Sequence, residues 1–119
     1  MQIPAFLLRK LYVKGSLENS DDGFSFKLKN SLSPGTTVGV TPIKVDDIEY
    51  ALDVTTIKTA DVNISAAEVS EENSFPIQVG VEILIEIKGD ALSEGEHKID
   101  IGLQTKEAGN LTFDVKDTI

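Results

Sequence analysis

The sequence predicts an all-β protein, an antiparallel β-sandwich of about seven to nine short strands in a single domain, residues 1–119. Three observations support this. Apolar and polar residues alternate with a period of two in four segments, turn residues recur about every ten positions, and no stretch has the composition of a linker. A small barrel is the alternative architecture.

The four alternating segments supply the predicted core. An apolar side chain at every second position places one face of a strand in the core and the other in water. The residues expected on the buried faces are Phe24, Phe26, Leu28, Val81, Ile83, Ile85, Ile99, Ile101, Leu103, Leu111, Phe113 and Val115.

Turn residues divide the chain into hairpins. Asp21-Asp22-Gly23 predicts a turn between strands over 12–17 and 24–28, and residues 106–110 predict another between the last two strands. Weaker strands are expected over 38–45, 48–52 and 54–58. Ser65, followed three residues later by Glu68, matches a capping box and predicts one short helical turn near 65–73.

The N-terminal segment over residues 3–13 is apolar without clean alternation. It is interpreted as a central strand, or one covered on both sides, and alternatively as a contact surface for another chain. Leu84 is apolar on a strand face that otherwise carries Glu82 and Glu86. The candidate interface therefore comprises Phe6, Leu7, Leu8, Leu11, Tyr12 and Leu84.

Charge and composition narrow the classes of partner and compartment. Twenty acidic and eleven basic residues give a net charge of −9, which would repel nucleic acid. The absence of cysteine removes disulfides, thiolate metal sites and thiol nucleophiles. No apolar stretch approaches the roughly 20 residues that cross a bilayer, so we expect a soluble, cytoplasmic protein without a membrane partner.

The residues that could carry chemistry are few. His97, the single histidine, is expected to hydrogen-bond a nearby backbone group, and a catalytic or ligand-binding role is the alternative. Clustered carboxylates such as Asp21/Asp22 and Asp46/Asp47 fall in predicted turns. We therefore predict no catalytic residue, no metal site and no cofactor. Possible ligand contacts are Tyr50, Phe75 and His97.

Four segments together resemble the small β subunits of C-glycoside deglycosidases and the bacterial and archaeal domains related to them. The segments are GFSFKL at 23–28, VDDIE at 45–49, AEVSEE at 67–72 and LSEGEHKIDI at 92–101. The resemblance implies a β-sandwich that assembles with a larger, metal-dependent barrel subunit carrying the catalytic residues. The family's aromatic, arginine-containing segment is replaced here by residues 31–36, which contain neither residue type.

The function expected from these observations is that of a non-catalytic accessory or interaction subunit. It would assemble with a larger, sugar-active enzyme or with itself as a homo-oligomer. The alternative is a small carbohydrate- or ligand-binding β-sandwich module. A third hypothesis is an enzyme that uses His97 with loop carboxylates.

Overall fold

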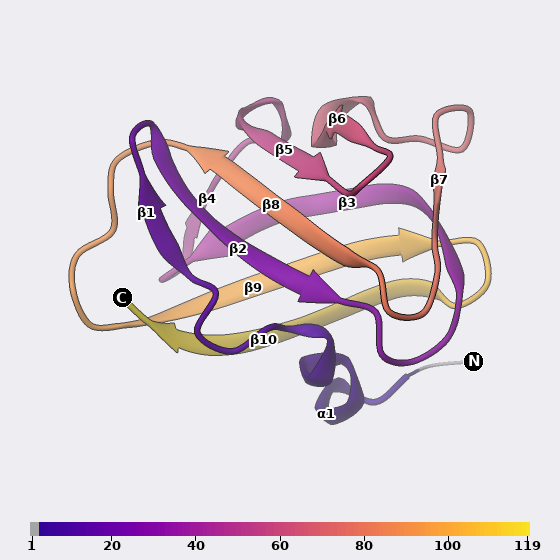
Figure 1. The fold of residues 1–119 in the computed structure, drawn as a ribbon, viewed down its shortest axis with the longest axis horizontal. Coiled ribbons are helices and arrows are strands. Elements are labelled where there is room, and N and C mark those ends of the chain that lie inside the picture. Colours follow the sequence, from indigo (N-terminus) through magenta and orange to yellow (C-terminus); the bar gives the residue numbers. More distant parts are fainter. Residues whose placement is uncertain (1–2) are drawn as a thin grey trace.

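Two antiparallel sheets pack against each other in the computed structural model, which describes residues 3–119 (Figure 1). The first sheet has the order β1-β2-β8-β5-β6 and the second the order β10-β9-β3-β4, with β7 pairing with the start of β3. Buried residues of both sheets form one hydrophobic cluster. The predicted all-β, sandwich-like fold is confirmed.

The strands of both sheets are short to moderate in length. The first sheet contains β1 (Glu18–Ser20), β2 (Gly23–Lys29), β8 (Glu82–Lys88), β5 (Thr55–Lys58) and β6 (Asn63–Ser65). The second contains β10 (Gly109–Thr118), β9 (Glu96–Thr105), β3 (Gly35–Val45), β4 (Ile48–Glu49) and β7 (Phe75–Ile77).

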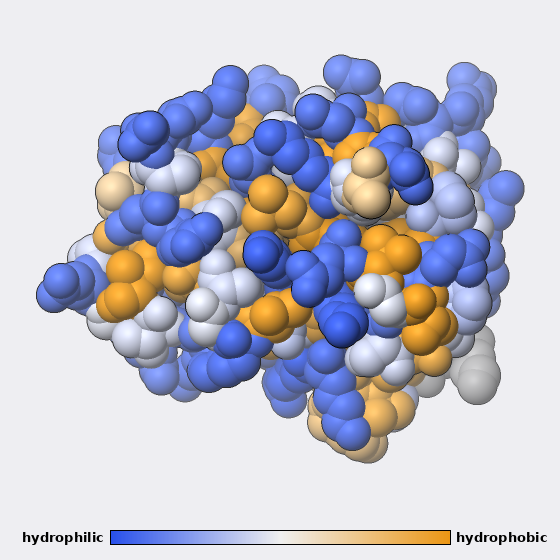
Figure 2. All heavy atoms as spheres, in the orientation of Figure 1, coloured by the Kyte–Doolittle hydropathy of each residue, from blue (hydrophilic) through white to orange (hydrophobic). Residues whose placement is uncertain are grey.

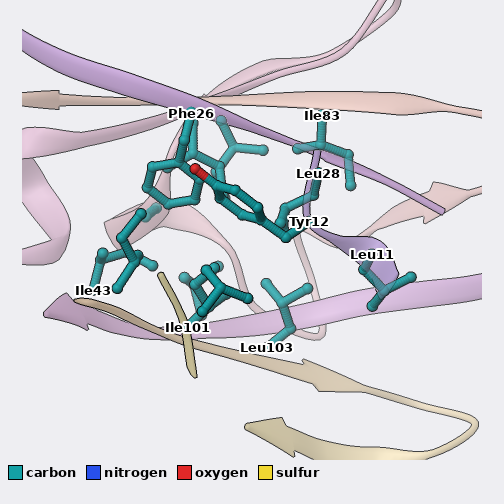
Figure 3. Packing of buried hydrophobic residues seen from close by; sticks show 14 of the residues in the cluster. Leu11, Tyr12, Phe26, Leu28, Ile43, Ile83, Ile101 and Leu103 are labelled. Atoms are coloured by element: carbon teal, nitrogen blue, oxygen red, sulfur yellow. The ribbon is translucent and has the colours of Figure 1, made fainter. Parts of the chain in front are cut away.

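The predicted core is confirmed except at one position. Every residue expected on a buried face is buried apart from Val81, which lies just before β8 and is half-buried. Polar side chains cover most of the molecular face in Figure 2, and apolar ones form small separate patches. Figure 3 shows side chains from the two sheets meeting in the interior.

The hairpin turns lie where the sequence places them, but some strands differ in extent. At the β3–β4 turn Asp46 and Asp47 have φ angles of 53° and 68°, the left-handed conformation that tight two-residue hairpins require. The strand expected over 12–17 is wrong, because β1 pairs with β2 only from Glu18 onward. The strand expected over 48–52 is reduced to β4, and η2 (Leu52–Val54) follows it.

The N-terminal segment is helical, so the strand predicted over 3–13 is wrong. It forms α1 (Ala5–Leu8) and η1 (Arg9–Leu11), and Pro4 precedes the first helical residue, where a missing N–H costs little. Leu8 and Leu11 are three residues apart and share one helical face, which is buried. The segment therefore follows the helical period rather than the period of a strand.

The remaining helical element is a single 3₁₀ turn, η3 (Ala66–Glu68). Ser65 Oγ accepts a hydrogen bond of 3.4 Å from the N–H of Ala67, so the short helical turn predicted near 65–73 is confirmed. Over residues 3–119 none of these helices combines the length and the apolar composition that crossing a bilayer requires.

Truncation of core and surface residues tests which face of each strand is buried. Phe26→Ala should lower the free energy of unfolding by about 3–5 kcal/mol, because it opens a cavity between the sheets. Glu82→Ala, at an exposed position of β8, should change it by less than about 0.5 kcal/mol. Denaturant titration measures both values, and equal losses would contradict the assignment of buried and exposed faces.

Candidate functional site

Asp117 is a buried carboxylate in β10 that binds the N-terminal segment, which in the structure runs from the helical residues 5–11 through residue 17. It is 2% exposed, and its Oδ2 accepts hydrogen bonds from the Tyr12 hydroxyl at 2.7 Å and from the N–H groups of Gly15 and Leu17 at 3.0 and 3.2 Å. Its Oδ1 accepts from the N–H of Thr118 at 2.9 Å. The donors satisfy the carboxylate inside the protein, as a buried charge requires.

The protonation states of Asp117 and Tyr12 follow from this contact. Burial on its own would raise the pKa of Asp117, but hydrogen bonds from Tyr12, Thr118, Leu17 and Gly15 bring it below its usual value. Burial and the bond to Asp117 raise the pKa of the Tyr12 phenol. The depressed pKa of Asp117 therefore contributes stability above its unfolded value of about 4, and this contribution is lost as the pH falls through the folded value.

The segment that Asp117 holds joins the two sheets along one side of the sandwich. Tyr12 forms an isolated bridge with Leu28 of β2 in the first sheet. Arg9 donates from Nε to the Asp114 carbonyl at 2.9 Å and from Nη2 to the Asp114 carboxylate at 3.0 Å in the second sheet. The segment thereby covers part of the outer edge of β10, which would otherwise be open to pairing with another strand.

His97 lies in β9 with both ring nitrogens engaged. Nδ1 is 2.6 Å from Asp46 Oδ2 and Nε2 is 2.7 Å from the Ser93 carbonyl oxygen. Asp46 Oδ1 also accepts from the N–H of Lys98 at 3.0 Å. Two acceptors around one imidazole favour its doubly protonated form. The ring thus connects the β3–β4 turn to the chain entering β9, and its contact with Ser93 is a backbone hydrogen bond of the kind predicted for it.

The structure does not bring the three predicted ligand contacts together. Phe75 is buried in β7, and Tyr50 is half-buried, with its ring edge-on to Phe24 at a centroid distance of 5.2 Å. His97 is occupied as described above. The two sheets also enclose an apolar cavity of about 90 Å³, and none of the three residues lines it.

The predicted interface is divided between buried and accessible residues. Leu8, Leu11 and Tyr12 are buried in the chain's own core and are not available to another chain. Phe6 on α1 is 63% exposed, and Leu7 is half-buried.

Leu84 of β8 is half-buried and lies between two neighbouring strands of the first sheet. Its cross-strand partners are Lys27 of β2 and Lys58 of β5. Side chains at directly paired positions share one face of a sheet, and lysine stems can cover apolar surface while their ammonium groups remain in water. The position therefore needs no second chain to account for its partial burial.

An apolar cavity of about 90 Å³ opens between the two sheets at the end that contains the β9–β10 turn. Its walls come from both sheets and from η1, and Figure 3 labels Leu11, Leu28, Ile83 and Leu103 among them. The apolar residues in the wall include Leu11, Leu28, Ile83, Leu103 and Leu111.

Thr37 of β3 lines this cavity and is fully buried. Within residues 3–119 its Oγ1 has no hydrogen-bond partner. A buried hydroxyl without a partner costs about 1–3 kcal/mol, so Thr37 is an energetically unfavourable polar group at this position.

The rim of the cavity is held by a carboxylate. Glu107 accepts from the Thr36 N–H at 2.8 Å through Oε1 and from the Thr36 hydroxyl at 2.9 Å through Oε2. These bonds from the backbone and then the side chain of Thr36 lower the pKa of Glu107. The β9–β10 turn is thereby attached to the start of β3, beside Thr37.

A wider depression lies on the outer face of the second sheet. It has a volume of about 510 Å³, and its lining includes Lys98, Asp100, Gly102 and Asp114. The Lys98 Nζ atom is 3.8 Å from Asp100 Oδ1, and Asp114 forms an ion pair with Arg9. Within residues 3–119, no three histidine, aspartate or glutamate side chains are grouped as metal ligands.

Titration of the single histidine tests the environment described for it. The Ser93 carbonyl and then Asp46 raise the pKa of His97 above its usual value of about 6.5. The resulting stability is present in full below about pH 6.5 and is lost as the pH rises through the folded pKa. Proton NMR should give a midpoint above 6.5 in the wild type and a lower one in Asp46→Asn. A wild-type midpoint at or below 6.5 would contradict the arrangement.

Comparison with protein families gives one match over nearly the entire chain. The family model described as Hydroxymethylglutaryl-CoA reductase, N-terminal domain, matches residues 7–119. A comparison with curated proteins gave no match. The resemblance to small β subunits of C-glycoside deglycosidases stays a prediction. Because the match runs from α1 to the last residue, the chain belongs to the family described as the N-terminal domain of hydroxymethylglutaryl-CoA reductase.

Proposed function

We propose that this chain is a non-catalytic accessory domain that assembles with a larger enzyme subunit or with a second copy of itself. The main supporting observation is the state of its single histidine, since both nitrogens of His97 are held by Asp46 and Ser93. A general base needs a free nitrogen within reach of a substrate proton. Membership of a family named after one domain of an enzyme also supports an accessory role.

The buried carboxylate supports the same proposal. Asp117 is surrounded by donors of its own chain, and these contacts hold the N-terminal segment in place. Its lowered pKa favours the ionised form, so it is not suited to donating a proton near neutral pH. The contacts of the buried residues His97 and Asp117 therefore stabilise the fold.

The surface that we propose for assembly is centred on Phe6. The α1 helix carrying it is fixed by the buried Leu8 and by the contacts between Arg9 and Asp114, so Phe6 is presented on an ordered element. Apolar side chains lie over α1 at the lower edge of the molecule in Figure 2. Aromatic residues on such elements frequently dominate the binding energy of an interface. We place the assembly in the cytoplasm, because a chain without cysteine needs no oxidising compartment to fold.

A small ligand-binding module is the second candidate function, and the apolar cavity with Thr37 in its wall favours it. Carbohydrate binding has less support, because sugar sites commonly use exposed aromatic faces. Phe75 is buried, and the ring of Tyr50 packs against Phe24.

A pair of matched substitutions tests assembly through α1. Phe6→Glu should disrupt association, because a charge would have to be buried at the contact. Ile48→Glu is the control, since Ile48 is similarly exposed, at 60%, but lies in β4. Light scattering should show a complex that persists in high salt for the wild type and the control, and a monomer for Phe6→Glu.

Assembly with a larger subunit is tested by co-expressing this chain with the polypeptides encoded next to its gene. The wild type and Ile48→Glu should copurify with that subunit in a fixed ratio, and Phe6→Glu should not. A wild type that is monomeric at every concentration and does not copurify would contradict the proposal. Equal behaviour of the two variants would contradict the assignment to Phe6.

A further inference from the structure

We infer that the cavity between the two sheets is a binding site for a short, neutral aliphatic molecule with one terminal hydroxyl or carbonyl group, whose polar end bonds to Thr37. Two independent observations support this inference. The cavity is lined mainly by apolar side chains, and Thr37 in its wall is 0% exposed with an unpartnered Oγ1 among residues 3–119. The inference does not depend on assembly through α1.

The size of the cavity limits the ligand. Its volume of about 90 Å³ exceeds the ~10–15 Å³ that a cavity needs to hold one water and is smaller than the ~150 Å³ of an engineered apolar cavity that binds benzene. A chain of about three to five carbon atoms is appropriate for this space. Leu28 and Ile83 of the first sheet and Leu103 and Leu111 of the second would contact its carbons.

The chemistry of the wall selects a neutral polar end. The Thr37 hydroxyl can donate one hydrogen bond and accept others, so it can bind either an alcohol or a carbonyl. An ionised carboxylate buried beside a single neutral hydroxyl would lose most of its hydration without a compensating charge. Lys29 and Glu107 both line the cavity and have opposite charges, so the chain's net charge of −9 is the remaining electrostatic factor, and it opposes an anion.

Hydrogen bonds around the cavity mouth fix the positions of the residues that form it. Both carboxylate oxygens of Glu107 bind Thr36, the residue before Thr37. Asn30 donates to the carbonyls of Ser33 and Ile77 at 2.9 and 3.2 Å, which attaches the loop after β2 to β7. Such contacts order the cavity mouth before a ligand binds, which reduces the entropy lost on binding.

Titration with 1-butanol, followed by methyl NMR of the full chain, tests the inference. We expect saturable shifts at Ile83 and Leu103. Binding of 1,4-butanediol should be at least about fivefold weaker, because its second hydroxyl would be buried without a partner. Thr37→Val keeps the β-branched shape but removes the hydroxyl, and it should weaken 1-butanol binding at least about fivefold.

Two alanine variants distinguish the cavity from other surfaces. Ala108 lines the cavity, so Ala108→Leu should reduce its volume and abolish the saturable shifts. Ala67 is exposed on η3 and absent from the cavity lining, so Ala67→Leu should bind 1-butanol like the wild type. Shifts that do not saturate, or that persist in Ala108→Leu, would overturn the site. Equal affinity in Thr37→Val would overturn the role of Thr37.

Discussion

The contact between Asp117 and the N-terminal segment is the constraint on which much of this structure depends. A buried carboxylate is stable only when donors surround it, and three of its four donors here belong to residues 12–17, the last part of that segment. Gly15 supplies one of them from a φ of +85°, a conformation that glycine adopts without steric cost. The polar contact therefore specifies where the segment turns and which strand it follows.

Several other features follow from the position of that segment. Leu8 and Leu11 enter the core from its helical part, and burial of each contributes about 1.5–3 kcal/mol. Leu11 also forms part of the cavity wall. Lys14 donates to the Lys116 carbonyl at 2.7 Å, which covers a further part of the β10 edge. The proposed contact residue Phe6 lies on the opposite side of α1 from the buried Leu8 and remains exposed.

The sequence predicts those strands in which apolar and polar residues alternate without interruption. Alternation identifies β2, β8, β9 and β10 with their buried faces, and the same parity places His97 and Asp117 inward with Ile99 and Val115. Asp117 could thus have been recognised as a carboxylate on a buried face. Three of its four donors could not, because they belong to a segment about 100 residues away in the chain.

Other features depend on tertiary structure that the pattern does not contain. The N-terminal segment is apolar enough for either a buried strand or a helix, and packing against β10 selects the helix. The pairing of β3 with β9 shifts register between Thr37 and Gly39 and again between Thr41 and Lys44. Side-chain parity is lost at such irregularities, so alternation could not place Thr37 in the core. The cavity that it lines is likewise formed by segments distant in sequence.

Native-state hydrogen exchange at the Gly15 and Leu17 amides tests most directly whether Asp117 positions the N-terminal segment. Asn at position 117 retains one acceptor oxygen but adds an amide group that cannot accept from these donors. Our account predicts that Asp117→Asn lowers protection of both amides by at least about tenfold, while the Ile85 amide in β8 keeps most of its protection. Unchanged protection at Gly15 and Leu17 would contradict the account.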